Sequence, residues 1–393
     1  MNRYQRNRDR TRHLWVCSCL LVGMPVHARY DEADRFSLQA SLEALYDSNL
    51  FRLADDESTA GLVREDVITT PRLSTRYNQD FSRQNLALSA ALFSPRYMNN
   101  RSMDYSGYQW SATWKGAAGS LLRPGASLSQ SHTLASFDDV AQGIKDMVDE
   151  QNLMAGLQLG DGHRARIIVD VARRDSEHDR RPSLDLVEQG WDMTAGWRTA
   201  RGTDWSLVYQ DRWIAYEQDS LLSRDYRRRK VSAELSWPVT AQLTTRLSSG
   251  WINWQFELGD QSSTERFGRA EVQWRASDKL RWLASAQRDA DDAGNNARVS
   301  VSNNYLLQAD WQMTQKVASQ LSWTQRRTQY GVVESSLLPS QHDVTDSYRL
   351  SVNWTPYSMV ASELYGVVQN RRSSSSASAY SDERVGLDLT VKY

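Results

Sequence analysis

The stretch that decides the fold is the last one of the chain, Val385-Gly386-Leu387-Asp388-Leu389-Thr390-Val391-Lys392-Tyr393. Its odd-numbered positions are apolar or aromatic, and its even-numbered positions are polar or lack a side chain. Successive side chains of a β-strand point to opposite faces of the sheet. The stretch therefore predicts a strand with one apolar face and one polar face.

Two kinds of protein carry such a strand. A terminal strand that is apolar outside, polar inside and ends on an aromatic residue resembles the closing strand of bacterial outer-membrane β-barrels. An ordinary half-exposed strand of a soluble sheet has the same alternation, so the rest of the chain must decide between them.

Working outward from the end, the same alternation repeats with a period of about 40 residues, the length of two strands with one short and one long connection. In six of these units a tryptophan lies within three residues of the short polar turn that follows it: Trp114, Trp197, Trp237, Trp274, Trp311 and Trp354. The alternating runs are too long for the four short strands of a β-propeller blade. We predict an all-β, antiparallel, up-and-down transmembrane barrel of about 18 strands (range roughly 16–20), with short periplasmic turns and long extracellular loops. The first of these external loops is predicted over Asp47–Asp66.

The tryptophans share one position in each hairpin, next to the short turn. Tryptophan and tyrosine outnumber phenylalanine, with 15 Trp and 17 Tyr against 7 Phe, and these two residues favour membrane–water interfaces. We therefore expect an aromatic girdle at the periplasmic rim, formed by Trp114, Trp197, Trp237, Trp274, Trp311, Trp354 and Tyr393.

The beginning of the chain has the pattern of a secretory signal peptide, predicted over residues 1–28. Five arginines between Arg3 and Arg12 precede a short apolar run, and Val26-His27-Ala28 is a suitable cleavage site. The apolar run is shorter than the ~20 residues of a transmembrane helix. Residues 29–393 are then the barrel, and both cysteines, Cys17 and Cys19, lie in the predicted signal. We expect no disulfides in the mature chain.

The overall composition restricts the function. The net charge is -1, which argues against a nucleic-acid partner, and the mean hydropathy of -0.64 excludes a helical membrane protein but not a barrel.

His132, His163, His178 and His342 fall in predicted turns or loops without metal-ligand spacing. The Ser129-Gln130-Ser131-His132 stretch permits a Ser–His hydrolase, but no third group orients it. We expect neither catalysis nor a metal or cofactor.

The face opposite the lipid-facing positions predicts the lumen wall. Its basic candidates are Lys115, Arg164, Arg166, Arg198, Lys230, Arg246, Arg269, Arg275, Arg281, Arg349 and Lys392. Its acidic candidates are Asp170, Asp192, Glu234, Glu271, Asp310 and Asp388. A basic excess would favour anionic solutes. The alternative is that the arginines pair with acids on neighbouring strands and hold the wall together.

Three apolar residues, Ile252, Trp254 and Phe256, are out of phase with the outward positions of their strand. Either they face inward, where aromatic rings stack on sugars, or a β-bulge turns them outward. The sequence leaves both possibilities open.

Finally, one local motif adds a resemblance. The opening strand, the following Asp47-Ser48-Asn49-Leu50-Phe51-Arg52-Leu53, the tryptophan hairpins and the Val391-Lys392-Tyr393 end resemble the EpsL-type outer-membrane barrels, which accompany exopolysaccharide biosynthesis loci. The resemblance implies export of an extracellular polysaccharide. Alternatives are a porin for small anionic or sugar solutes and a closed structural barrel. In each case we expect outer-membrane lipid as surroundings and the barrel-assembly machinery as a partner of Val385–Tyr393.

Overall fold

The computed structural model describes residues 34–54, 61–138, 143–160, 164–217, 225–257, 262–291, 300–330, 341–375 and 378–393. The predicted signal peptide, residues 1–28, lies outside them. The strands are β1 (Phe36–Asp47), β2 (Asp66–Phe81), β3 (Gln84–Phe93), β4 (Arg96–Tyr97), β5 (Gly107–Gly116), β6 (Leu122–Leu134), β7 (Met147–Leu159), β8 (Ala165–His178), β9 (Leu186–Arg198), β10 (Asp204–Tyr216), β11 (Tyr226–Pro238), β12 (Leu243–Phe256), β13 (Ser262–Arg275), β14 (Leu280–Asp291), β15 (Ser300–Gln312), β16 (Val317–Tyr330), β17 (Gln341–Tyr357), β18 (Val360–Ser373) and β19 (Tyr380–Lys392). Two short 3-10 turns, η1 (Arg101–Met103) and η2 (Pro182–Leu184), join them. No helix in the described part of the chain is long and apolar enough to cross a membrane.

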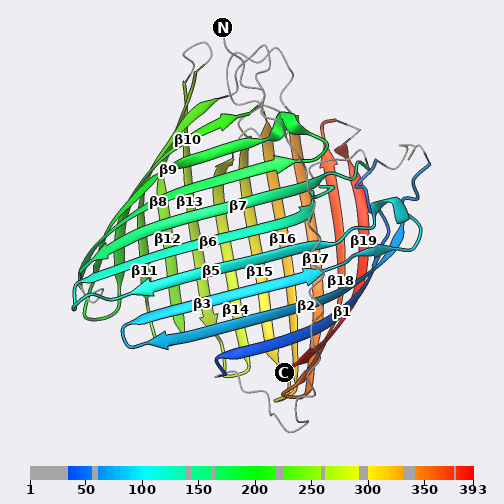
Figure 1. The fold of residues 1–393 in the computed structure, drawn as a ribbon, viewed down its shortest axis with the longest axis horizontal. Helices are drawn as coiled ribbons and strands as arrows, with labels where there is room; N and C mark the ends of the chain where they lie inside the picture. The colour runs from blue at the N-terminus through cyan, green and yellow to red at the C-terminus, as the bar shows by residue number, and fades with distance from the viewer. Residues whose placement is uncertain are drawn as a thin grey trace, which may run out of the picture.

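The sheet closes on itself. Each strand pairs antiparallel with its neighbours, and the last strand, β19, pairs with β1 from Gln39–Lys392 to Asp47–Arg384 (Figure 1). Both β3 and β4 pair with β2, so they are one strand interrupted near Pro95. Counted in this way, the 19 elements make an 18-stranded barrel, which confirms the predicted fold.

The connections alternate in length around the barrel. The short turns include residues 82–83, 199–203 and 358–359, and all lie at the end that holds the C-terminus (Figure 1). The other end carries longer connections, such as residues 48–65 and 135–146. We call these the short-turn end and the long-loop end.

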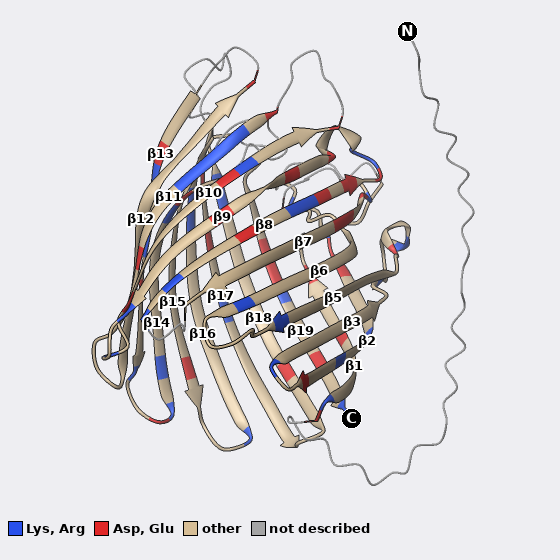
Figure 2. Ribbon diagram, turned by 60° about the vertical axis from the view of Figure 1, so that its left-hand side comes forward, with Lys and Arg blue, Asp and Glu red and all other residues tan. Residues whose placement is uncertain are grey.

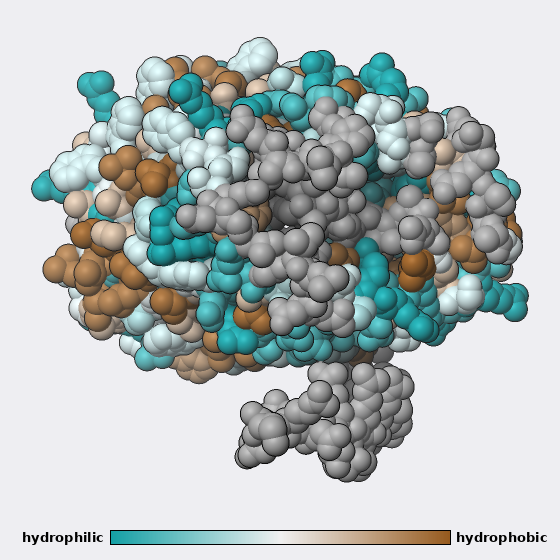
Figure 3. Space-filling view, turned by 90° about the horizontal axis from the view of Figure 1, so that it is seen from above, coloured by the Kyte–Doolittle hydropathy of each residue, from teal (hydrophilic) through white to brown (hydrophobic). Residues whose placement is uncertain are grey.

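The two faces of the barrel differ in chemistry because the side chains alternate. Large apolar residues such as Leu207 (63% exposed) and Leu350 (55%) project from the outer face. Charged residues of both signs lie along many of the strands (Figure 2). In the view from above, hydrophobic residues gather on the left flank (Figure 3). The apolar half of each strand therefore faces away from the protein interior, the reverse of a soluble core.

The last strand, β19, is held by both of its neighbours, β18 and β1. Gly386 of β19 lies against the ring of Tyr365 on β18, and a Cβ at Gly386 would stand 2.2 Å from the Cζ atom of that ring. The Tyr365 hydroxyl donates a hydrogen bond of 2.6 Å to Glu43 on β1. The glycine thus allows a side chain to link the first strand to the last two.

The register of β12 shows which way its out-of-phase side chains point. β12 pairs with β11 without interruption from Tyr226–Phe256 to Pro238–Thr244, so there is no bulge. Ile252 and Trp254 therefore face inward, and Trp254 is completely buried in a cluster with Ile214, Tyr226 and Phe267. These rings fill space at the long-loop end and do not form an open stacking surface for sugars.

Candidate functional site

A tight turn directly after β1 lies inside the mouth of the barrel. We call residues Asp47–Ala54 the cap turn. The Asn49 side chain accepts a hydrogen bond from the Leu53 N–H at 3.0 Å and donates one to the Leu53 carbonyl at 2.9 Å, while the Asn49 N–H donates to Asp47 at 2.9 Å. Asp and Asn form such side-chain-to-backbone bonds readily, which is why this sequence turns here. Arg52 takes the left-handed conformation, with φ of 57°.

The apolar side chains of the cap turn pack inward. Phe51 is completely buried, and its ring meets that of Phe137 edge-on with centroids 5.0 Å apart. Leu50 and Leu53 join the same cluster, which includes Ile68 of β2 and Tyr97 of β4. Leu45, Ile68 and Tyr97 share a row of the sheet on its inner face. The cap turn is therefore fixed to the inner wall at the long-loop end, although the sequence predicted an external loop here.

Arg52 pairs with the first residue of the cap turn and with two other parts of the chain. Its guanidinium contacts both carboxylate oxygens of Asp47 at 3.0 Å, Asp138 at 3.1 Å and Asp382 of β19 at 3.4 Å. Burial alone would lower the pKa of Arg52, but the hydrogen bond to Asp47 and the neighbouring carboxylates raise it above its usual range. The side chain is therefore a permanent cation between acids, two of which are themselves buried.

Another buried carboxylate organises the rim beside the cap turn. Asp66, the first residue of β2, accepts hydrogen bonds from the backbone N–H groups of Met98, Asn99 and Asn100 at 2.8–3.0 Å. It orders the connection between β4 and β5, which supplies Met103 to the apolar cluster of the cap turn. Nothing in the local sequence distinguishes Asp66 from a loop residue.

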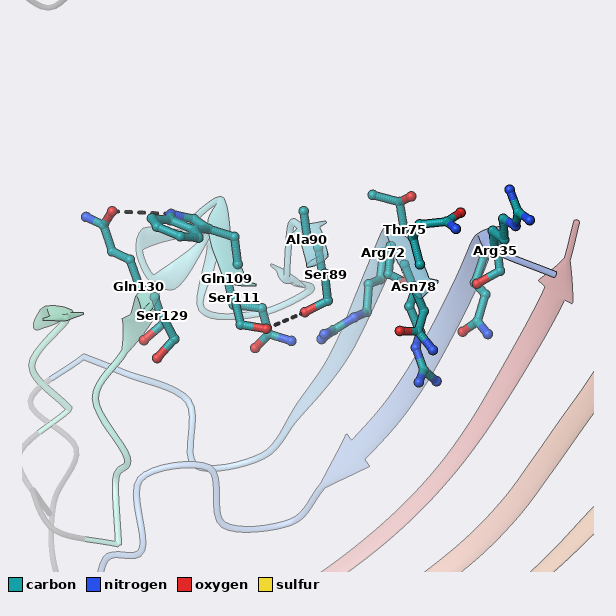
Figure 4. A pocket seen from close by; sticks show the side chains of 18 of the residues that line it. Arg35, Arg72, Thr75, Asn78, Ser89, Ala90, Gln109, Ser111, Ser129 and Gln130 are labelled. Carbon is teal, nitrogen blue, oxygen red and sulfur yellow. Dashed lines mark hydrogen bonds between the residues drawn. The ribbon is translucent and has the colours of Figure 1, made fainter. Parts of the chain in front are cut away.

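The wall formed by β1–β7 encloses a polar cavity of about 920 Å³. Most of its inner-facing residues carry hydroxyl or amide groups: Ser37, Gln39, Ser74, Asn78, Ser89, Gln109, Ser111, Ser129, Ser131 and Asn152. Arg72, Arg76, Asp80 and Glu150 add charges of both signs. The hydroxyls of Ser89 and Ser111 are 2.7 Å apart, and they lie on the same side as Arg72 and Asn78 (Figure 4). Gln130 and Thr75 point to the opposite side of the sheet (Figure 4). None of these residues, charged or neutral, was among the lumen candidates predicted from the sequence.

The wall formed by β8–β13 carries a charged cavity of about 580 Å³. Asp204 accepts from Arg166 at 2.6 Å and from Arg198 at 2.9 Å. Glu271 accepts from Arg246 at 2.6 Å and also from Arg269. Each carboxylate thus joins two arginines, and such charge-assisted pairs are strong. The sequence left two alternatives, a lumen wall with a basic excess and a wall in which arginines pair with acids. Both are present in this cavity, because the arginines pair with acids and still outnumber them.

The other predicted lumen residues lie mostly on the inner face, each with its own surroundings. Arg349 pairs with Glu363 at 2.8 Å, Arg281 with Asp310 at 3.4 Å, and the Lys230 ammonium lies 4.0 Å from the Phe267 ring centroid. Strand register also places Lys115, Glu234, Arg275, Asp170, Asp192, Asp388 and Lys392 on the inner face, while Arg164 lies in the turn before β8. Inner acids such as Asp204, Glu188 and Glu363 were not predicted, so the wall is more evenly charged than the predicted set.

The predicted girdle residues lie on the outer face at the short-turn end. Trp197, Trp237, Trp274, Trp311 and Trp354 are about half exposed, at 47–52%, and Trp114 is 37% exposed. Tyr393 follows β19 and exchanges backbone hydrogen bonds of 2.8 Å with Leu38. Trp205 and Tyr357, which the sequence analysis left out, are exposed at the same end.

The prediction that the histidines lie in turns or loops is wrong for three of them. His132, His178 and His342 belong to β6, β8 and β17, because these strands extend further than the alternation indicated, and His163 lies outside the described residues. His132 faces outward, where it contacts Asp149 at 2.9 Å, whereas Ser129 and Ser131 face the polar cavity. The serines and the histidine are thus on opposite sides of the sheet and cannot form a catalytic pair. No group of three metal-ligating side chains occurs among the residues that the structure describes.

Comparison with known proteins adds the context of the fold. No protein-family model matches the sequence, and no curated protein is similar to it. Several solved barrels are similar in structure at low identity. OccK9 (OpdG) of Pseudomonas aeruginosa is 10% identical with a TM-score of 0.54, over 91% of this chain and 98% of that one. OccAB4 of Acinetobacter baumannii is 9% identical with a TM-score of 0.52, over 92% and 99%. OpdK of Pseudomonas aeruginosa, solved with vanillate, is 10% identical with a TM-score of 0.51, over 91% and 98%. The chain thus has a porin-like barrel fold.

Proposed function

We propose that this chain is an outer-membrane porin that passes small polar solutes, with sugars as the favoured class. The exposed apolar outer face supports a lipid environment, with the short-turn end in the periplasm and the long-loop end outside. The observation that carries the proposal is the polar cavity, whose hydroxyl and amide side chains can both donate and accept hydrogen bonds. A neutral polyol offers the complementary groups at many positions.

The direct experiment is single-channel recording of the refolded protein in planar bilayers, together with swelling of liposomes in sugars of increasing size. We expect discrete conductance steps and uptake of small sugars that falls with their size. A refolded, membrane-inserted barrel that gives neither conductance nor swelling would show a closed structural barrel instead.

Substitutions on opposite faces of β5 test the solute path. Ser111 lines the polar cavity, and its neighbour Ala112 faces outward in the row of Leu88 and Leu128. Ser111→Trp should slow sugar uptake several-fold because the ring occupies the cavity, whereas Ala112→Trp should leave uptake unchanged. Equal uptake by both variants at equal insertion would place the solute path elsewhere.

The charged cavity predicts ion selectivity. Replacing both Arg246 and Arg269 by glutamine leaves the Glu271 carboxylate without either cation. The chloride-to-potassium permeability ratio, measured as the reversal potential in a salt gradient, should fall by roughly threefold or more. Arg173→Gln is the control, because Arg173 lies on the outer face beside Asp175. An unchanged reversal potential in the double variant would mean that ions avoid this wall.

A second candidate is export of an extracellular polysaccharide. The observation in its favour is the position of the cap turn, because the stretch that resembles EpsL-type barrels, Asp47–Leu53, lies inside the mouth and not on a surface loop. Deletion of the gene separates the candidates. Loss of secreted polysaccharide with normal sugar uptake would favour export, and the reverse result would favour the porin.

A further inference from the structure

The outer wall carries a groove that crosses six strands, β10–β15. We call this cavity of about 630 Å³ the wall groove. Its outward-facing floor consists of small residues: Ala233, Ser249, Gly268, Ala270 and Ala286. Larger side chains border it, with Trp205 at one end and Tyr305 at the other. Small side chains lower the surface locally, so the groove follows from the sequence of β11–β14.

The strand register gives the direction of the groove. Trp205, Leu235, Leu247, Ala270, Ala286 and Tyr305 form one continuous row of paired residues from β10 to β15. Trp205 lies near the short-turn end of its strand, whereas Tyr305 lies nearer the long-loop end of its own. Barrel strands tilt by ~35–45°, so a row perpendicular to them climbs the wall obliquely. A flexible hydrocarbon chain can occupy such a groove.

Arginines lie beside the end of the wall groove that is nearer the long-loop end. Arg288, Asn303 and Arg327 are successive members of the next row, on β14, β15 and β16, and Arg266 of β13 lies beside them. Strands are spaced by about 4.8 Å, so the Cα atoms of Arg288 and Arg327 are roughly 10 Å apart. Two guanidinium groups at this spacing can contact one phosphate from both sides. We call Arg266, Arg288 and Arg327 the arginine row.

The arginines of this row have fewer acidic partners than other outward-facing arginines of the barrel. Arg288 contacts Glu265 at 3.2 Å, but within the described ranges neither Arg266 nor Arg327 has a carboxylate in ion-pair distance. Elsewhere the outward arginines have close acidic partners, as in Arg173–Asp175, Arg227–Asp211 and Arg372–Asp346. A local positive excess beside an apolar groove complements a molecule that has an anionic head and a hydrocarbon tail.

We infer that the wall groove and the arginine row bind a phosphorylated lipid of the outer leaflet, with an acyl chain in the groove and a phosphate between Arg288 and Arg327. The inference depends on the outer-membrane location proposed above. A second copy of this chain is a poorer occupant, because a twofold contact through the same surface would bring two sets of these arginines together. A zwitterionic lipid offers the tail, but its ammonium opposes the arginines.

The test uses the full barrel in detergent, with diphosphoryl lipid A as probe and phosphatidylethanolamine as comparison. Native mass spectrometry should show retained diphosphoryl lipid A and at least tenfold less retained phosphatidylethanolamine. The Arg288→Gln/Arg327→Gln variant should lose at least tenfold in the bound fraction of lipid A, and the groove-filling Ala270→Phe variant should lose a similar amount. Arg173→Gln, the control at the same height, should bind normally.

Two outcomes would overturn the inference. Equal retention of both lipids, or normal lipid A binding by the arginine variant, would show that the arginine row does not recognise phosphate. A dimer that disappears in Ala270→Phe would instead make the groove an interface between copies. The channel proposal fails separately, because absence of conductance in a barrel that still binds lipid A would refute only the porin function.

Discussion

An Arg52→Gln barrel should conduct several times more current than the parent protein and should switch between conductance levels. Removal of the guanidinium leaves the buried Asp47 carboxylate without a cation, beside an Asp382 carboxylate that keeps only Arg384, at 2.8 Å. Loss of one partner of a buried ion pair costs ~3–5 kcal/mol. The cap turn can escape this cost by leaving the inner wall, whereas the strands on either side remain paired. Single-channel recording measures the change.

Two further variants control this experiment. Arg101→Gln removes an exposed arginine from η1 at the same end of the barrel and should leave the current unchanged. Arg52→Gln/Asp47→Asn removes the uncompensated charge and should restore much of the parent behaviour, and it also serves if the single variant folds poorly. If Arg52→Gln inserts normally and conducts like the parent, the cap turn does not limit the flow.

The position of the cap turn was not predicted from the sequence. Alternation and the tryptophan hairpins predicted the strands, their faces and their number, because these depend on residues two positions apart. The Asp47–Leu53 stretch is polar and lies between two strands, so it was predicted to be an external loop. Its burial depends on Phe137, Asp138 and Asp382, which are remote in sequence. No local pattern contains that information.

The candidate site, too, was predicted only in part from the sequence. Arg246, Arg269 and Glu271 were predicted to face inward, and they do so, but their pairing needed the register of β12 against β13. The hydroxyl and amide lining of β1–β7 was missed, since serine and glutamine on a polar face are equally common on soluble sheets. The inward Ile252 and Trp254 were visible as a break in phase, and only the uninterrupted pairing with β11 excluded a bulge.

The second large effect is expected from Leu247→Arg. Leu247 is 42% exposed on the outer face of β12, between Leu235 and Ala270 in one row. If this face meets hydrocarbon, an arginine near the middle of the apolar belt costs ~2–4 kcal/mol. The folded fraction after refolding into lipid, measured by the gel shift between unboiled and boiled samples, should fall sharply.

The neighbouring residue provides the control, because one step along the strand changes the face. Ser248 points inward in the row of Glu234 and Arg269, where an added arginine has a carboxylate on one side and water in the lumen. Ser248→Arg should therefore fold like the parent. Equal tolerance of both substitutions would mean that the outer face is not solvated by lipid, and the membrane location, the solute path and the lipid site would all lose their basis. Failure of Ser248→Arg alone would mean that the inner wall of β12 is too closely packed to line a channel, which leaves the location intact and removes the transport function.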